Sequence, residues 1–168
     1  AQAGILLERT KLYEEIQELL SSFIQAMVTT IDSRDITTSG HSRRLAGYAL
    51  GFAEAINRVD YGEYKNVFFI KEEIKELYYA ALLHDIGKVA IPDHILDKPG
   101  KLTEEEWEVM KTHCTLGYNV LKNSKRDILQ AAAIVSYTHH EKWNGSGYPL
   151  GIKGEDIHIF GRITAIAD

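Results

Sequence analysis

KEEIKELYYAALLHDIGK, residues 71–88, joins a helical pattern to a pair of adjacent residues that can bind metal. Its apolar side chains recur at the spacing of one helix face: Ile74, Leu77, Tyr78, Ala81 and Leu82. His84 and Asp85 follow at once, and we expect Gly87 to cap the end of the helix. The stretch therefore predicts a helix whose last turn carries chemistry.

The segments on both sides of this stretch are also predicted to be helical. Apolar residues recur at helical spacing over residues 5–31, 41–56, 125–140 and 159–168. The capping box from Thr103 to Glu106 begins another helix, which we expect to end near His113, with a short helix over 116–121 after it. No alternating strand pattern of useful length occurs, so the sequence predicts an all-α fold.

Composition and charge fit one ordinary globular domain. The chain has 168 residues, 26% of them charged, and a net charge of −5. No apolar run approaches the about 18 residues that a membrane span needs, so we expect no membrane contact within this segment. The single cysteine, Cys114, excludes an internal disulfide and fits a cytoplasmic location. The net charge argues against broad binding to nucleic acid, and no DNA partner is expected, but small phosphate substrates stay possible.

The chain is interpreted as a fragment of a longer protein, because it begins without methionine and stops inside an apolar helical pattern. Residues 1–30 form an N-terminal helix with an apolar stripe from Leu12 to Phe23, which spans fewer heptads than a coiled coil needs. This helix is either the end of a coiled-coil linker from an upstream domain, where it could pair two chains as a homodimer, or a core helix with a frayed start. Residues 31–168 form the domain that carries the chemistry.

Five of the seven histidines lie near predicted helix ends, on or beside apolar faces: His41, His84, His113, His139 and His140. One such histidine is more often a hydrogen-bonded core residue than a ligand. Five would be costly to bury without partners, and a shared metal centre would use their lone pairs. Together with Asp85 and Asp168 they form a set that suits iron, manganese or zinc. The set is too large for one tetrahedral ion, so we predict two ions, an arrangement typical of phosphoester hydrolysis.

Two motifs bring this set into a known family. HDIGK, residues 84–88, resembles the signature of the HD superfamily of metal-dependent phosphohydrolases, and HHEKWNGSGYP, residues 139–149, resembles the extended motif of its HD-GYP subfamily. HSRR at 41–44 and ITAIAD at 163–168 add to the match. The resemblance implies a helical bundle around a binuclear metal site, with residues 31–168 as an HD-GYP catalytic domain that lacks its C-terminal helices.

The resemblance also implies an activity. Such a domain hydrolyses cyclic di-GMP, a bacterial second messenger, to linear pGpG or GMP through attack by a metal-activated hydroxide. Two alternatives stay open. The chain could be a catalytically weak or inactive module that senses a nucleotide or binds a partner protein. It could also be an HD hydrolase of another nucleotide, including a mixed cyclic GMP-AMP.

Individual roles follow from the same resemblance. The two divalent ions would be iron or manganese, bound by all seven residues of the set: His41, His84, Asp85, His113, His139, His140 and Asp168. Asp85 would bridge the ions and Lys88 would contact the scissile phosphate, which makes both catalytic candidates; the alternative for Lys88 is a solvated cation. Gly147, Tyr148 and Pro149 would border the substrate, and their loop is either a docking surface for other signalling domains or purely structural.

The sequence departs from the family pattern at several positions. Members with three metals carry a glutamate four residues before the first histidine, and Thr37 stands there in this chain, which favours two ions. Cys114 replaces a usual proline and Asn144 a common aspartate, and we expect neither change to abolish metal binding. His94 and His158 match no ligand position and are interpreted as surface or loop residues.

Overall fold

The computed structural model describes residues 2–34 and 40–168, and within these ranges it contains helices and no β-strand. The all-α prediction is therefore confirmed. In chain order the elements are α1 (Gln2–Arg34), α2 (His41–Ile56), α3 (Lys71–Leu82), the 3-10 helix η2 (Ile86–Ala90), α4 (Asp93–Leu96), α5 (Glu104–Leu121), α6 (Asp127–Thr138), the 3-10 helix η3 (Gly154–Asp156) and α7 (Ile159–Ala167). Thr37 lies outside the described residues.

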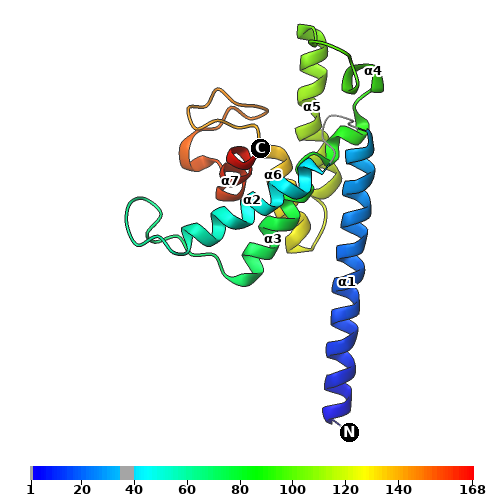
Figure 1. Ribbon diagram of the computed structural model, residues 1–168, viewed down its shortest axis with the longest axis vertical. Coiled ribbons are helices and arrows are strands. Elements are labelled where there is room, and N and C mark those ends of the chain that lie inside the picture. Colours follow the sequence, from blue (N-terminus) through cyan, green and yellow to red (C-terminus); the bar gives the residue numbers. More distant parts are fainter. Residues whose placement is uncertain (1, 35–39) are drawn as a thin grey trace.

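The core lies where α2, α3, α6 and α7 pack against one another, with α5 covering α6 and η2 (Figure 1). Much of it consists of short side chains that are almost fully buried: Ala46, Ala49, Ala53, Ala80, Ala81, Ala132 and Ala133. Because alanine adds little width to a helix, the backbones approach closely, and larger residues such as Leu45, Leu77 and Val135 fill the remaining space. This packing brings the helix ends that carry the histidines to one region.

Helix α1 has two unlike halves. Its last third packs on the bundle through Ile24, Val28 and Ile31, whereas its first half projects away from the other helices (Figure 1). There Leu12 and Ile16 are 57% and 55% exposed, so this part of the apolar stripe is a surface feature. Although α1 has 33 residues, no described helix combines the length and the apolar character needed to cross a membrane.

Two details of the predicted helices are wrong. Gly87 does not cap α3, which ends at Leu82; it lies inside η2, where a Cβ would collide with the carbonyl oxygen of His113. The two helices predicted over 104–113 and 116–121 are one helix, α5, because Gly117 packs against Ser136 and η2 and does not break it. The capping box at the start of α5 is present as predicted, and the short helix α4 follows Pro92.

Candidate metal centre

The structure gathers all seven predicted ligands into one cluster, and most of them lie at helix ends. His41 is the first residue of α2, and His84 and Asp85 form the turn between α3 and η2. The other four are His113 inside α5, His139 and His140 directly after α6, and Asp168 directly after α7. Residues that are 127 positions apart in the chain, such as His41 and Asp168, therefore become neighbours.

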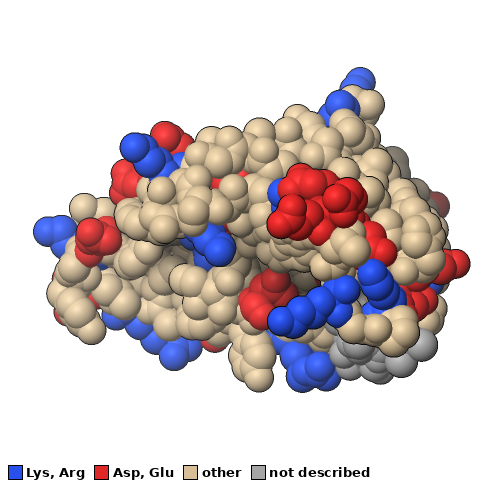
Figure 2. All heavy atoms as spheres, turned by 90° about the horizontal axis from the view of Figure 1, so that it is seen from above, with Lys and Arg blue, Asp and Glu red and all other residues tan. Residues whose placement is uncertain are grey.

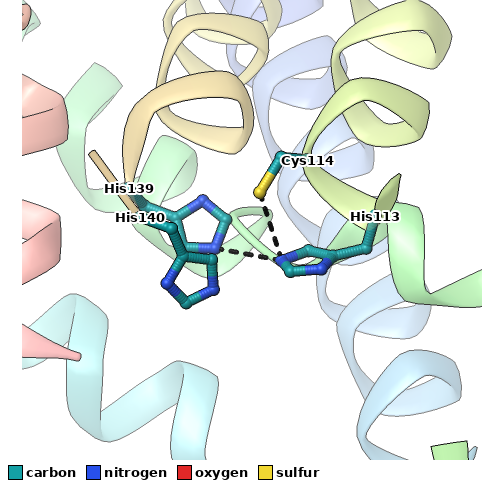
Figure 3. Close-up of side chains that lie close together, drawn as sticks. All are labelled: His113, Cys114, His139 and His140. Atoms are coloured by element: carbon teal, nitrogen blue, oxygen red, sulfur yellow. Dashed lines mark hydrogen bonds between the residues drawn. The ribbon is translucent and has the colours of Figure 1, made fainter. Parts of the chain in front are cut away.

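Two groups of ligand atoms can be distinguished within the cluster. In the first, His41 Nε2 lies 2.9 Å and His84 Nε2 4.0 Å from Asp168 Oδ1. In the second, His113 Nε2 lies 3.3 Å from His139 Nε2, and the rings of His139 and His140 lie 4.1 Å apart (Figure 3). Within each group, which in the second case includes Cys114, the possible ligand atoms are all within 4.8 Å of one another, and the same holds for a third, overlapping group of His84, Asp85 and His139.

Asp85 joins the two groups. One of its oxygens, Oδ2, lies 3.2 Å from His84 Nε2, and the other, Oδ1, lies 3.3 Å from His113 Nε2. Oδ1 is also 3.7 Å from His139 Nε2. Because a carboxylate has two oxygens with separate lone pairs, it can serve one ion with each of them.

Backbone carbonyls fix the orientation of three of the rings. His84 donates from Nδ1 to the Ala81 oxygen at 2.8 Å, and His113 donates from Nδ1 to the Met110 oxygen at 2.7 Å. His139 Nδ1 lies 3.1 Å from the carbonyl oxygens of Val135 and Ser136. A carbonyl oxygen only accepts, so the proton is on Nδ1 and the Nε2 lone pair of the neutral ring faces the cluster, as in metal-binding histidines.

Two buried atoms of the cluster have no hydrogen-bond partner: His84 Nε2 and Asp85 Oδ1. Both residues are at least nine-tenths buried. Leaving such groups unsatisfied costs about 1–3 kcal/mol each, and more for a charged group. Both atoms carry lone pairs and lie next to other atoms that carry lone pairs. A cation is therefore the partner that satisfies them, and the residues present fit a metal.

The electrostatics of the cluster keep His113, His140 and Asp85 available as ligands, whereas Asp85 and Asp168 more than offset the burial of His84 and raise its pKa. Burial lowers the pKa of His113 to about 4 and that of His140 to about 3, so both rings are neutral at pH 7. Burial alone would raise the pKa of Asp85, but His84, His139 and Lys88 outweigh it and hold that pKa well below its ordinary value. The carboxylate is therefore ionised.

Lys88, the residue predicted to contact the phosphate, lies beside the cluster. It belongs to η2, its side chain is 17% exposed, and its Nζ lies 2.7 Å from Asp85 Oδ2. Its charge is thus held next to the residue that joins the two ligand groups. Figure 2, which shows the molecule from above, has basic and acidic side chains intermixed on this face.

The loop after His140 packs onto the cluster. The ring of Tyr148 stacks on that of His140, with centroids 4.8 Å apart and 28° between the planes, and the Tyr148–Pro149 peptide is cis. A Cβ on Gly147 would collide with the backbone of residues 140–142, so this glycine has a packing role in addition to any contact with substrate. Pro149 is exposed at the rim.

Sequence reasoning assigned no role to two residues near the cluster. Cys114 is fully buried, and its Sγ lies 3.4 Å from His113 Nε2 (Figure 3). Glu141 is 4% exposed, and its Oε1 accepts hydrogen bonds from the backbone of Leu150 and Gly151 at 2.6 and 3.2 Å, which holds the loop. One feature of the sequence could have identified Glu141: it is an acidic residue that lies directly between two histidines and a glycine-rich loop.

The chain is similar to known proteins over most of its length. The chain is 40% identical over 98% of its length to 3'3'-cGAMP-specific phosphodiesterase 2 of Vibrio cholerae. It is 41% identical over 97% to a cyclic di-GMP phosphodiesterase of Thermotoga maritima, and 39% identical over 92% to the cyclic di-GMP phosphodiesterase response regulator RpfG of Xanthomonas campestris. The chain spans 30%, 42% and 38% of the lengths of these relatives. Residues 69–168, more than half of the chain, match the family described as HD domain, and the chain belongs to that family.

Proposed function

We propose that the chain is the catalytic part of a bacterial phosphodiesterase that cleaves cyclic di-GMP. The observation that carries this proposal is the position of Asp85, whose two oxygens face two separate groups of metal-ligand atoms. A carboxylate between two such groups can be shared by two ions, and paired ions are typical of phosphoester hydrolysis. The names of the relatives point to the same class of substrate.

The proposed cofactor is a pair of divalent ions, iron or manganese. His41, His84 and Asp168 would hold one ion, and His113, His139 and His140 the other, with Asp85 shared between them. Imidazole and carboxylate donors together suit these metals. When bound, such ions lower the pKa of a water molecule, so that a nucleophile is present at neutral pH, and they offset the charge of the phosphate.

The side chains of this chain would supply orientation and charge. The ammonium of Lys88 is fixed beside Asp85, where it can offset the negative charge that a phosphodiester gains as it is attacked. The Nδ1 hydrogen bonds of His84, His113 and His139 keep their rings in place, so the site needs little rearrangement during the reaction. Gly147, Tyr148 and Pro149 would border the substrate.

The products would be linear pGpG, GMP or both. A mixed cyclic GMP-AMP is a second candidate substrate, because the chain is also 40% identical to a relative named as specific for 3'3'-cGAMP. Both substrates present the same phosphodiester to the proposed site and differ in one base. The same metal centre would therefore act on either, and residues that contact the base would decide between them.

Two protein contacts complete the proposal. The apolar stripe on the first half of α1 is exposed, and we place a second copy of the chain there, so that the two helices pair as a homodimer. The loop of Tyr148 and Pro149 would serve as a docking surface for other signalling domains. Light scattering of the wild type and of Leu12→Glu tests the homodimer, since a charge within the stripe should yield monomers.

Metal analysis of anaerobically purified protein, combined with chromatography of the products, tests the proposed activity. We expect about two iron or manganese ions per chain and conversion of cyclic di-GMP to a linear product. A parallel incubation with 3'3'-cGAMP determines which substrate is preferred. Fewer than about one ion per chain would contradict the metal centre. Full loading without cleavage of either compound, repeated with a chain extended beyond Asp168, would favour the sensing or interaction module instead.

A further inference from the structure

The side chain of Arg34, the last residue of α1, reaches the 3-10 helix that carries Lys88. Its Nη1 donates to the carbonyl oxygens of Lys88, at 3.4 Å, and of Val89. Its Nη2 donates to the carbonyl oxygen of Ile91 at 3.1 Å and pairs with the carboxylate of Asp93. One guanidinium thus contacts three backbone carbonyls at the end of η2 and one acidic side chain.

These contacts satisfy groups that a helix end leaves open. The last carbonyls of a helix have no partner within it, and a cation near that end is favourable. The Lys88 oxygen accepts one backbone bond, from Ile91 N at 3.0 Å, and Arg34 adds a second donor to it. Arginine has five N–H donors in a planar fork, so it can hold several carbonyls together, whereas lysine offers one compact group.

The base of this side chain is itself held firmly. Ile24, Val28 and Ile31, which precede Arg34 on α1, are buried in the core. Two residues before Arg34, the Asp32 carboxylate accepts a hydrogen bond from Ser42 Oγ at 2.8 Å, on the turn of α2 that begins with His41. The last turn of α1 therefore has a fixed position relative to two parts of the metal centre.

A displacement of η2 would move Lys88 relative to Asp85 in the proposed site. Lys88 N donates to the Asp85 carbonyl oxygen at 2.9 Å, and Lys88 Nζ lies 2.7 Å from Asp85 Oδ2. We propose that Arg34 is a positioning residue, which fixes the backbone of η2 so that the Lys88 ammonium is held beside the metal ligands. The kinetic test of this proposal rests on the phosphodiesterase function proposed above, whereas its structural test does not.

The kinetic test compares Arg34→Met and Arg34→Lys with the wild type in the metal-loaded full chain, using cyclic di-GMP. Misplacement of a reacting group by about 1 Å can cost roughly 100-fold in rate, so we expect kcat to fall on the order of 10- to 100-fold in Arg34→Met. KM and metal content should stay near the wild-type values. Arg34→Lys should recover part of the loss, since an ammonium can still bind one or two carbonyls. Arg58→Met is the matched control, because Arg58 lies close to the end of α2 and its side chain forms only an exposed pair with Glu54 among the contacts described.

A double-mutant cycle asks whether Arg34 acts through Lys88. In a Lys88→Met background, Arg34→Met should cause little further loss, because the ammonium that it positions is already gone. Hydrolysis of an activated aryl phosphodiester supplies a measurable rate if cyclic di-GMP turnover becomes too slow. Equal fold losses with and without Lys88 would overturn the proposal.

Amide hydrogen exchange provides the structural readout. In Arg34→Met, the amides of residues 86–91 should exchange faster while those of the α3 core stay protected. Unchanged exchange over 86–91 would overturn the proposal even if activity fell. If the metal-loaded wild type cleaves no cyclic dinucleotide, the proposed function fails, and the exchange experiment still decides the role of Arg34.

Discussion

Asp85 and Lys88 form an ion pair in which Nζ lies 2.7 Å from Oδ2, while Oδ1 of the same carboxylate has no hydrogen-bond partner. The two oxygens thus have different surroundings, one facing an ammonium and one facing His113 at 3.3 Å. A carboxylate that is buried, ionised and half satisfied is a costly feature for a purely structural core. Its presence is explained if Asp85 helps to hold metal ions, with the Lys88 ammonium as a cation that the chain supplies beside them.

Replacement of Asp85 should reduce metal content more than replacement of any histidine of the cluster. Asp85 lies between both ligand groups, whereas His41 and His113 each belong to one. We expect Asp85→Asn to lose close to both ions, and His41→Asn or His113→Asn to lose about one, measured by elemental analysis per chain. His94→Asn serves as the control, since His94 is exposed on α4. Retention of both ions by Asp85→Asn would contradict the shared-ligand assignment.

Replacement of Lys88 should separate chemistry from metal binding. Lys88→Met removes the charge but no metal ligand, so metal content should match the wild type. The loss of one preorganised charge typically costs about 10²–10³ in kcat, and we expect a decrease of that order on cyclic di-GMP. Lys75→Met, which removes an exposed lysine that contacts Gln17, should have wild-type kinetics. Loss of metal in Lys88→Met would show that its role has been misassigned.

The sequence was sufficient to predict most of the helices and the set of residues that meets in the cluster. Each predicted ligand next to a helix end could be found locally, because helical spacing and a following break are both properties of neighbouring residues. The role of Gly87 could not be found in this way. A glycine after an apolar run indicates a cap, and only the approach of α5 shows that Gly87 makes room for the backbone at His113.

Polar contacts between residues far apart in the chain could not be predicted from the sequence either. Arg34 ends a polar stretch of α1, and its partners begin 54 residues later, so no local pattern connects them. The continuity of α5 through Gly117 also depends on contacts between distant segments. There the contacts with η2 and Ser136 outweigh the low helix propensity of glycine. In each case the missing information concerns which surfaces meet, which a single sequence does not contain.

The metal-free protein should lose stability as the pH falls from about 6.5 toward 4. Burial lowers the folded-state pKa of His113 to about 4 and of His140 to about 3, against 6.5 when unfolded. In this window the unfolded chain binds more protons, so acidification favours unfolding, by at most about 2 kcal/mol per histidine at pH 5. His84 acts in the opposite sense, since Asp85 and Asp168 more than offset its burial and raise its pKa.

Urea denaturation at pH 7 and pH 5 in the presence of a chelator measures this dependence. His140→Gln should flatten it, because the variant removes a group that titrates only when the chain unfolds. His94→Gln removes an exposed histidine and should leave the slope unchanged. A steeper slope in His140→Gln, or a wild type that is more stable at pH 5 than at pH 7, would refute the assignment of neutral buried rings.

Cys114 should be chemically inert in the folded protein. Its side chain is fully buried, and burial raises the pKa of the thiol, so the reactive thiolate is scarce at pH 8. We expect thiol reagents to modify it only after unfolding in urea. Cys114→Ala should retain the wild-type metal content, because the histidines and Asp85 supply the ligands. Loss of about one ion in Cys114→Ala would instead identify the thiol as a ligand, since its Sγ lies only 3.4 Å from His113 Nε2.

Gly147→Ala should disrupt the loop that carries Tyr148, whereas Gly51→Ala should stabilise the protein. An added Cβ at Gly147 would meet backbone atoms of residues 140–142, which cannot move without shifting His140, but nothing lies within 4 Å of a Cβ at Gly51 on α2. We expect Gly51→Ala to gain about 0.5–1 kcal/mol from reduced backbone entropy of the unfolded chain. Gly147→Ala should lower both thermal stability and metal content, because the stacked pair of Tyr148 and His140 must separate. Thermal unfolding and elemental analysis of the two variants, purified in parallel, distinguish the outcomes, and wild-type metal content in Gly147→Ala would show that the loop does not support the centre.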